Sequence, residues 1–212
     1  MTATMPAGEV FSHALRGETC YLSTPDRQRL RLPVADWTRA TDGSDDLLLQ
    51  ACLGATLDIG CGPGRMVAEL AARGHVTLGI DVVGEAVRQT VDRGAAALMR
   101  DVFARVPGEG RWETALLADG NIGIGGDPAA LLARARRLLH PGGRVVVEVA
   151  GPGERSAHFD ARLECACGHS ERFPWAVVSI DALPALADAA GLVEIDRLTA
   201  HGRWVGVLTE AA

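Results

Sequence analysis

The chain has 212 residues, of which 48% are hydrophobic, and a formal net charge of -6 at neutral pH. This hydrophobic content can fill one core, and the length lies within the range of a single domain. A general nucleic-acid surface would need clustered cations to neutralise phosphates. The 21 basic residues, all of them arginine, are scattered along the chain, so we expect no nucleic-acid partner.

The sequence also lacks the patterns of a membrane-bound or secreted chain. No stretch of about 18 or more unbroken apolar residues is present, and the N-terminal segment lacks the basic start and apolar run of a signal peptide. We therefore expect a cytoplasmic protein without a membrane partner. The sequence leaves a monomer and a homodimer open.

The most informative segment is residues 56–65, Thr-Leu-Asp-Ile-Gly-Cys-Gly-Pro-Gly-Arg. An apolar and β-branched run that contains Asp58 leads into a loop with Gly60, Gly62 and Gly64. Glycine lets a ligand approach the main chain closely, and apolar residues at helical spacing follow the loop. This order of strand, glycine loop and helix predicts a nucleotide-cofactor site.

Two features separate this loop from the dinucleotide fingerprint. The third glycine of that pattern would fall at Arg65, so the pattern is broken. A carboxylate at Asp58 would also repel a pyrophosphate, whereas it suits a cationic or amine-bearing ligand. An NAD(P)-dependent oxidoreductase of the same topology is therefore the alternative, and not the first choice.

With the loop Asp58-Ile-Gly-Cys-Gly-Pro-Gly64, the chain resembles the class I S-adenosylmethionine-dependent methyltransferases. The resemblance runs in order through about residues 50–150, and it includes Leu139-His-Pro-Gly-Gly-Arg144 ahead of a valine-rich strand. It implies an α/β, Rossmann-like, doubly wound sheet that is mostly parallel with helices on both faces. It also implies S-adenosyl-L-methionine as cofactor and S-adenosyl-L-homocysteine as product.

The predicted elements follow the chain in this order. We expect strands over residues 56–59, 75–80, 96–100, 114–118 and 144–149, and then over 192–198 and 204–209. Asp127 and Pro128 predict a helix start, and Asp181 is expected to cap a helix that runs through Ala190. His201-Gly-Arg203 is short enough to be a hairpin connection, so the last two strands should form an antiparallel C-terminal edge pair.

The resemblance assigns the acids at the strand ends to the cofactor. The amino-acid end is expected against Asp58, Gly60, Cys61 and Gly62, and the ribose at Asp81 and Val82. The adenine is expected at Asp101 and Val102, and the transferred methyl group beside Asp119, Gly120 and Asn121. An acid roughly 20 residues after a glycine loop is the usual partner of ribose hydroxyls.

We expect one methyltransferase domain over residues 1–212 with four parts. These are an N-terminal cap or arm (1–50), a cofactor-binding core (51–150), a substrate-side insert (151–175) and a segment that closes the sheet (176–212). Phe11, His13, Tyr21 and Trp37 in the first part have no clear period, as expected for a lid over a cavity. An ordinary arm packed on the sheet is the alternative.

Histidines near the acceptor are candidates for a general base, because His titrates near neutral pH. His158, His169 and His13 are the candidates in that order, because the insert should border the carboxyl edge where ligands bind. Asp119 is a further candidate. Amine, thiol and carboxylate acceptors can also react after simple positioning, without a base.

No metal is expected. Cys165 and Cys167 with His158 and His169 offer ligand types for zinc, but the Cys-x-Cys spacing has no matching second clip. Reduced cysteines are the expectation. Arg134, Arg136 and Arg137 are interpreted as a solvated helix face.

These patterns favour transfer of a methyl group to oxygen or nitrogen of a small molecule, as in specialised metabolism. Asp119-Gly-Asn-Ile122 lacks the Asn-Pro-Pro-Tyr type of sequence found in enzymes that methylate nucleic-acid bases. A non-catalytic cofactor-binding protein of the same fold is a third hypothesis.

Overall fold

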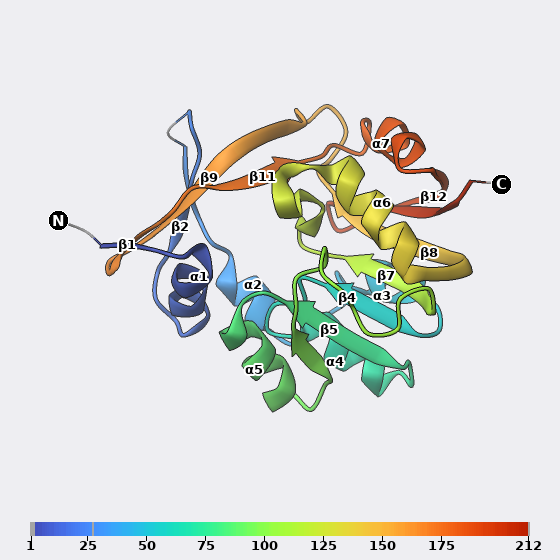
Figure 1. Cartoon of the computed structure of the whole chain (residues 1–212), viewed down its shortest axis with the longest axis horizontal. Helices are drawn as coiled ribbons and strands as arrows, with labels where there is room; N and C mark the ends of the chain where they lie inside the picture. Colours follow the sequence, from blue (N-terminus) through green and yellow to red (C-terminus); the bar gives the residue numbers. More distant parts are fainter. Residues whose placement is uncertain (1–2, 27, 212) are drawn as a thin grey trace.

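The computed structural model describes residues 3–26 and 28–211, which form two β-sheets and their covering helices (Figure 1). The larger sheet has seven strands in the order β12-β13-β8-β7-β4-β5-β6. Their bounds are β4 Thr56–Ile59, β5 Thr77–Asp81, β6 Ala97–Met99, β7 Trp112–Leu117, β8 Leu139–Val149, β12 Leu192–Ala200 and β13 Arg203–Glu210. Strands β4 to β8 pair in parallel, which confirms the predicted doubly wound, mostly parallel α/β sheet.

Alternate residues of the central strands supply two separate cores, as the period of two in a strand requires. On β8, Val145 and Val147 enter one core, and Val146 enters the other. On β7, Leu117 packs in the core that contains Val145, and Leu116 packs in the core that contains Val146. Both faces of the sheet are therefore buried, which explains the unbroken apolar runs of these strands.

Helices cover the two faces (Figure 1). On one face lie α3 Asp46–Ala51 and α4 Arg65–Ala72, with α5 Gly84–Asp92 beside α4. On the opposite face lie α6 Pro128–Leu138 and α7 Leu183–Ala189. No helix of the described residues is long and apolar enough to cross a membrane.

The C-terminal edge hairpin is confirmed. Strand β12 pairs antiparallel with β13, and β13 pairs antiparallel with β8. The connection is the tight turn His201-Gly202, with φ of 53° and 76°. Both strands are longer than predicted by one or two residues at their ends.

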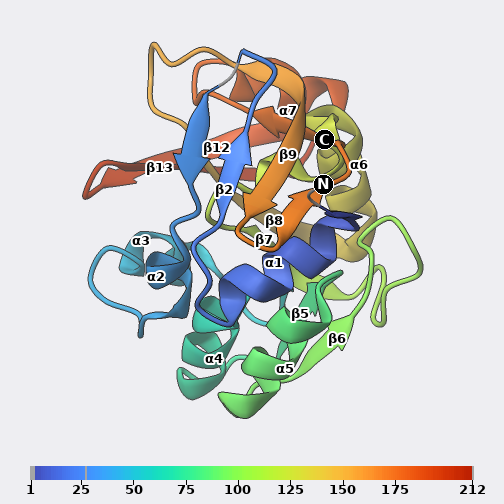
Figure 2. The same ribbon diagram turned by 90° about the vertical axis from the view of Figure 1, so that its left-hand side faces the viewer.

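The second sheet joins the N-terminal segment to the insert, a pairing that the sequence did not predict (Figure 2). It contains β1 Ala3–Met5, β2 Tyr21–Ser23, β3 Arg29–Arg31, β9 Ala157–Cys165, β10 Gly168–Ser170 and β11 Phe173–Val177. Strand β9 lies between β2 and β10, and β11 also pairs with β9. Helices α1 Ala7–Leu15 and α2 Val34–Thr38 connect this sheet to the cofactor side of the molecule.

Two local predictions need correction. Arg134 is not solvated: it is buried on α6, and it donates hydrogen bonds to the carbonyls of Val102 and Ala104 and pairs with Glu109. It therefore ties the loop after β6 to the helix. The last helix begins at Leu183 instead of being capped by Asp181, whose carboxylate accepts a hydrogen bond from the Gly153 amide at 2.8 Å.

Candidate functional site

A cavity of about 640 Å³ opens at the carboxyl ends of β4, β5 and β7. This is where the strand order reverses, since β4 pairs with β5 on one side and β7 on the other. In open α/β sheets, ligands bind at such a reversal point. The predicted cofactor residues that line the cavity are Asp58, Gly60, Cys61, Gly62, Asp81, Val82, Asp101, Val102, Asp119 and Asn121; Gly120 is absent from the lining.

Gly60 is fixed by a close approach of Asn121. The amide nitrogen of the Asn121 side chain donates to the carbonyls of Ile59 at 3.0 Å and Gly60 at 2.8 Å. A Cβ on Gly60 would stand 2.8 Å from that nitrogen, and φ is 73°, so a side chain is excluded on two grounds. Asn121 thus clamps the glycine loop to the segment after β7.

Asp81 connects the glycine loop with the start of α5. Its carboxylate accepts hydrogen bonds from the backbone amides of Gly62 at 3.0 Å and Val83 at 2.8 Å. Burial raises the pKa of Asp81, and these amides act in the opposite direction. The carboxylate is therefore held in one orientation at the edge of the cavity.

Asp58 is a buried carboxyl that lines the cavity and accepts no hydrogen bond from any described residue. Burial raises its pKa to about 8; the negative charge of Asp119 adds to the shift, and Arg65 opposes it. A buried carboxyl without a partner fits a ligand that brings a positive charge or an amine donor.

Asp119 follows β7 and is held by two arginines. Its carboxylate lies 2.6 Å from Nη2 of Arg65 and 3.0 Å from Nη2 of Arg203, and its φ is 52°. Burial raises the pKa of Asp119, whereas Arg65 lowers it. Asp45 and Glu148 extend the contacts into an ionic network: Asp45 pairs with both arginines, and Glu148 pairs with Arg203.

The other half of the cavity is aromatic. It is lined by Phe11 of α1, Trp37 of α2, and Phe173 and Trp175 of β11. Phe11 and Trp37 thus lie where a lid over a cavity was expected. His13 and Tyr21, from the same segment, do not line it.

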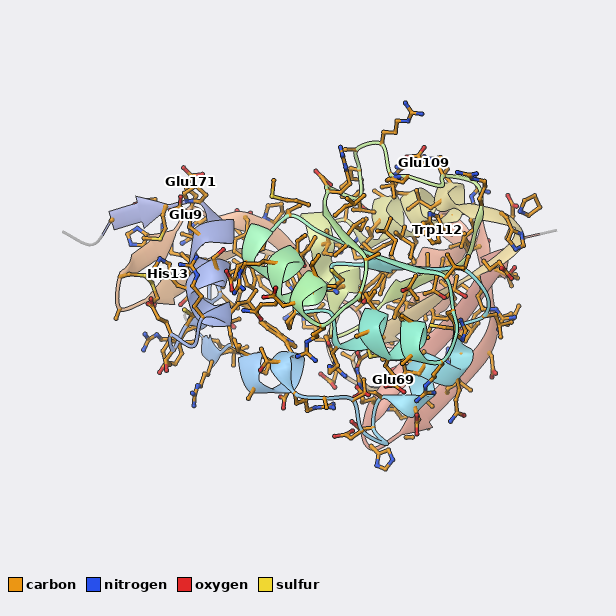
Figure 3. The ribbon with its side chains drawn as sticks, turned by 90° about the horizontal axis from the view of Figure 1, so that it is seen from below. Glu9, His13, Glu69, Glu109, Trp112 and Glu171 are labelled. Carbon is orange, nitrogen blue, oxygen red and sulfur yellow. A yellow bond between two sulfur atoms is a disulfide. The ribbon has the colours of Figure 1, made fainter. Side chains whose placement is uncertain are left out.

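The three candidate histidines also lie outside the cavity lining. His13 lies on α1, toward the end of the molecule opposite to Trp112 of β7 (Figure 3). Its Nδ1 is 2.6 Å from Oε1 of Glu18. His158 Nδ1 is 2.6 Å from the carbonyl of Gly126, and His169 Nε2 is 3.0 Å from Thr4 Oγ1. Each imidazole thus contacts a residue of the N-terminal segment, Glu18 or Thr4, or of the segment after β7, Gly126. The assignment of a base to one of them stays a prediction without a supporting contact.

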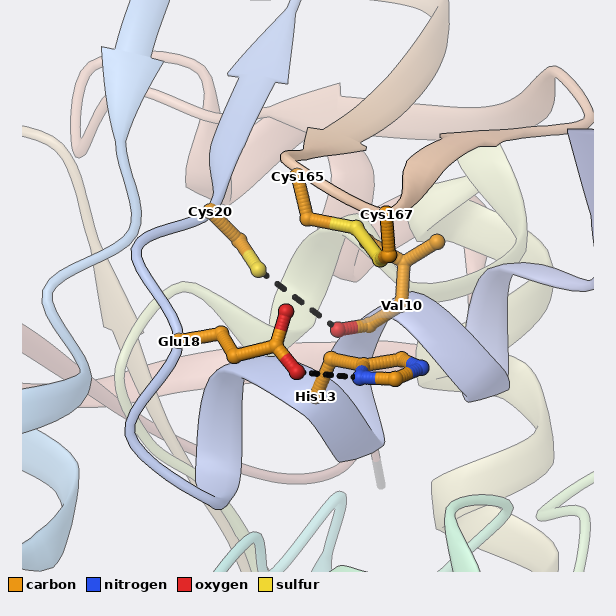
Figure 4. The surroundings of a disulfide bond; sticks show 6 residues. All are labelled: Val10, His13, Glu18, Cys20, Cys165 and Cys167. Atoms are coloured by element: carbon orange, nitrogen blue, oxygen red, sulfur yellow. Dashed lines mark hydrogen bonds and ion pairs between the residues drawn. A yellow bond between two sulfur atoms is a disulfide. The ribbon is translucent and has the colours of Figure 1, made fainter. Parts of the chain in front are cut away.

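The expectation of reduced cysteines is wrong for one pair, because Cys165 and Cys167 form a disulfide across the β9–β10 turn (Figure 4). The spacing of two residues brings the two sulfurs together when the strands reverse direction. His13, Glu18 and Cys167 place ligand atoms within 4.8 Å of one another. In the disulfide, Cys167 has no thiolate to offer a metal.

The sequence reasoning missed the roles of Arg31, Arg65 and Trp175 in the cavity. In the sequence, Arg65 stands out only as a break in a glycine pattern. Trp175 belongs to the insert, where no period points to a cavity. The signal that could have found it is the aromatic group Phe173-Pro-Trp175 together with the glycine-rich stretch 120–126, since glycines allow an aromatic side chain to pack closely against the main chain. No local pattern distinguishes Arg31 from its neighbour Arg29.

A doubly wound sheet with a glycine loop and carboxylates at successive strand ends defines an α/β protein that binds a nucleoside-containing cofactor. Residues 56–143 match the family described as "Methyltransferase domain", a range that contains every predicted cofactor residue. Over this range the chain is similar in sequence to the methyltransferase-domain family, and its fold is that of the class I S-adenosylmethionine-dependent methyltransferases.

Known structures share this fold at low sequence identity. A methyltransferase from Bacteroides fragilis, in complex with S-adenosyl-L-homocysteine, superposes with a TM-score of 0.81 at 18% identity, covering 100% of this chain and 99% of that one. A 1,6-didemethyltoxoflavin-N1-methyltransferase from Burkholderia thailandensis gives 0.58 at 20% identity, covering 80% and 76%.

A curated relative is an uncharacterised 37.1 kDa protein of transposon TN4556 from Streptomyces fradiae. It is 34% identical over an alignment of 155 residues that covers 66% of this chain. The match spans 41% of the length of that relative.

Proposed function

We propose that the protein transfers the methyl group of S-adenosyl-L-methionine to oxygen or nitrogen of a small-molecule acceptor, as in specialised metabolism. The observation that carries the proposal is one cavity that joins the predicted cofactor residues to an aromatic compartment. The B. thailandensis enzyme, crystallised with bound 1,6-didemethyltoxoflavin and S-adenosylhomocysteine, supports a small-molecule acceptor.

The residues of the cavity fit this cofactor. When bound, the cofactor would supply the methyl group of its sulfonium to a lone pair of the acceptor, and S-adenosyl-L-homocysteine would leave as the carbon–sulfur bond breaks. Asp58 presents a buried, unpartnered carboxyl to the cationic amino-acid end, and Asp81 presents a carboxylate for the ribose hydroxyls. Asp101 and Val102 line the part of the cavity proposed for adenine.

The chain's contribution to the transfer is proposed to be alignment and exclusion of water. Asp119 is held by Arg65 and Arg203, and its orientation fixes the wall beside the expected methyl position. An amine acceptor would need no base. A phenol would lose its proton to water or to Asp119, the one catalytic candidate that lines the cavity.

We propose further that residues 1–212 act as one domain, with 51–150 binding the cofactor and 176–212 closing the sheet. The cap 1–50 and the insert 151–175 would then enclose the acceptor together, which their shared sheet supports. We also propose a cytoplasmic enzyme, monomer or homodimer, without a membrane partner. The acidic net charge supports the absence of a nucleic-acid partner.

Calorimetric titration with S-adenosyl-L-methionine, S-adenosyl-L-homocysteine and NAD tests the cofactor assignment. Both adenosyl ligands should bind, and Asp81→Ala should weaken them about tenfold or more, because hydrogen bonds to a charged group contribute roughly 1.5–3 kcal/mol each. Asp92→Asn on the exposed face of α5 is the matched control and should bind like the parent. Binding of NAD alone would establish the oxidoreductase alternative instead.

A further inference from the structure

The aromatic residues of the cavity form a continuous chain. Ring centroids lie 6.5 Å apart for Phe11 and Trp37, 6.4 Å for Phe11 and Phe173, and 6.3 Å for Phe173 and Trp175. These are four of the nine aromatic residues of the protein. Their spacing is that of interacting rings, and an aromatic guest can join such a group by stacking or edge contacts.

Aliphatic side chains of the β2–β3 region complete this compartment. Leu22, Leu30, Leu32 and Pro33 line the same cavity, and Leu30 is 53% exposed despite its apolar side chain. A large apolar side chain that faces an open cavity favours a ligand with apolar surface. A sugar or another densely hydroxylated acceptor would find few partners here.

The charges of the cavity are divided between its halves. The carboxyl groups of Asp58, Asp81, Asp101 and Asp119 lie at or just after strand ends of the large sheet, and Arg65 and Arg100 line the cavity on the same side. On the cap side, the charged residue in the lining is Arg31, the last residue of β3. Arg31 makes no ion pair with any described residue, whereas Arg29 on the same strand stacks on Tyr21 and pairs with Glu164.

The close approach of β11 to the glycine-rich segment η1, Asn121–Gly126, holds Trp175 in place. A Cβ on Gly123 would stand 2.2 Å from the carbonyl of Ala176 and 2.7 Å from the Trp175 ring. The ring can reach its position only because residue 123 has no side chain. The aromatic wall is therefore built into the same segment that follows the expected methyl position.

We infer that the acceptor is a flat aromatic molecule that carries a carboxylate or a comparable anionic group. Its ring lies among Phe11, Trp37, Phe173 and Trp175, and its anion pairs with Arg31. An unpaired guanidinium with its planar fork of donors matches a carboxylate. This inference rests on the proposed function, because the acceptor site is defined relative to the cofactor residues.

The test uses the full chain saturated with S-adenosyl-L-homocysteine and a panel of hydroxylated or aminated benzoates and naphthoates, each paired with its neutral carboxamide. Binding is measured by calorimetry and by quenching of tryptophan fluorescence. At least one carboxylate should bind at least tenfold more tightly than its carboxamide. Arg31→Gln should abolish this preference, and the matched control Arg29→Gln should keep it.

The outcomes separate the two proposals. Failure of S-adenosyl-L-homocysteine to bind would overturn the proposed function, and with it this inference. Cofactor binding without any carboxylate preference in the panel would overturn the inference and leave the proposed function intact. A preference that survives Arg31→Gln would also overturn it, since Arg31 would then not be the anion site.

Discussion

Nη2 of Arg65 lies 2.6 Å from a carboxylate oxygen of Asp119, which joins the start of α4 to the end of β7 beneath the cavity. Arg65 stands where a dinucleotide-binding loop would have its third glycine. Its side chain is only 3% exposed, and it also pairs with the fully buried Asp45. Arg65, which breaks the dinucleotide-binding pattern, thus lines this cavity and holds Asp119 in place.

Arg65→Met should destabilise the protein by about 3–5 kcal/mol, because it leaves the buried Asp45 and the partly buried Asp119 without a main counter-charge. Urea unfolding measures the loss. The matched control is Arg88→Met, which removes only pairs of a 58% exposed arginine and should cost less than about 1 kcal/mol. Equal effects of the two variants would refute a structural role for the buried network.

Acid should weaken the fold through Asp45. Burial opposes ionisation of Asp45, yet hydrogen bonds from Arg39 and Arg65 outweigh burial and lower its pKa. A carboxyl with a lowered folded-state pKa contributes stability above its unfolded value of about 3.9, and this contribution disappears as pH falls. Thermal unfolding below about pH 5 should therefore show a steeper loss for the parent than for Asp45→Asn, which starts less stable at neutral pH. Parallel curves for the two proteins would contradict this role.

Cofactor affinity should rise with pH up to about 8. The pKa of Asp58 in the ligand-free site is about 8, so the carboxyl is largely protonated at neutral pH. A cationic ligand favours the carboxylate, so binding releases a proton and strengthens by up to about tenfold per pH unit below that value. Titrations in buffers of different ionisation enthalpy count the released protons. Asp58→Asn should bind more weakly and lose the pH dependence; unchanged dependence would assign it to another group.

Gly123→Ala should displace Trp175 without removing the cofactor site. The added methyl group overlaps the Ala176 carbonyl, and such overpacking costs roughly 1–3 kcal/mol. We expect a changed tryptophan emission and weaker acceptor binding, with S-adenosyl-L-homocysteine affinity within about threefold of the parent, a difference below 1 kcal/mol. Gly43→Ala is the control, since a Cβ there meets no atom within 4 Å. Full acceptor binding in Gly123→Ala would contradict the role of this close approach.

Sequence patterns alone predict the large sheet, and most of the residues that they propose for the cofactor line one cavity. Apolar runs, helix caps and glycine turns are local patterns, and parallel strands bring the acids after β4, β5 and β7 to one edge by geometry alone. The hairpin at His201-Gly202 followed from its short connection. Local patterns therefore suffice to predict that these residues meet at one edge of the sheet.

The aromatic half of the cavity, proposed for the acceptor, depends on long-range contacts that no local pattern predicts. Phe11, Trp37 and Trp175 lie far apart in sequence, and they meet because the cap and the insert pair in a second sheet. The burial of Arg134 and the raised pKa of Asp58 likewise depend on which distant segments cover them. Period and spacing record how a residue relates to its neighbours in the chain, whereas burial and charge pairing depend on long-range packing.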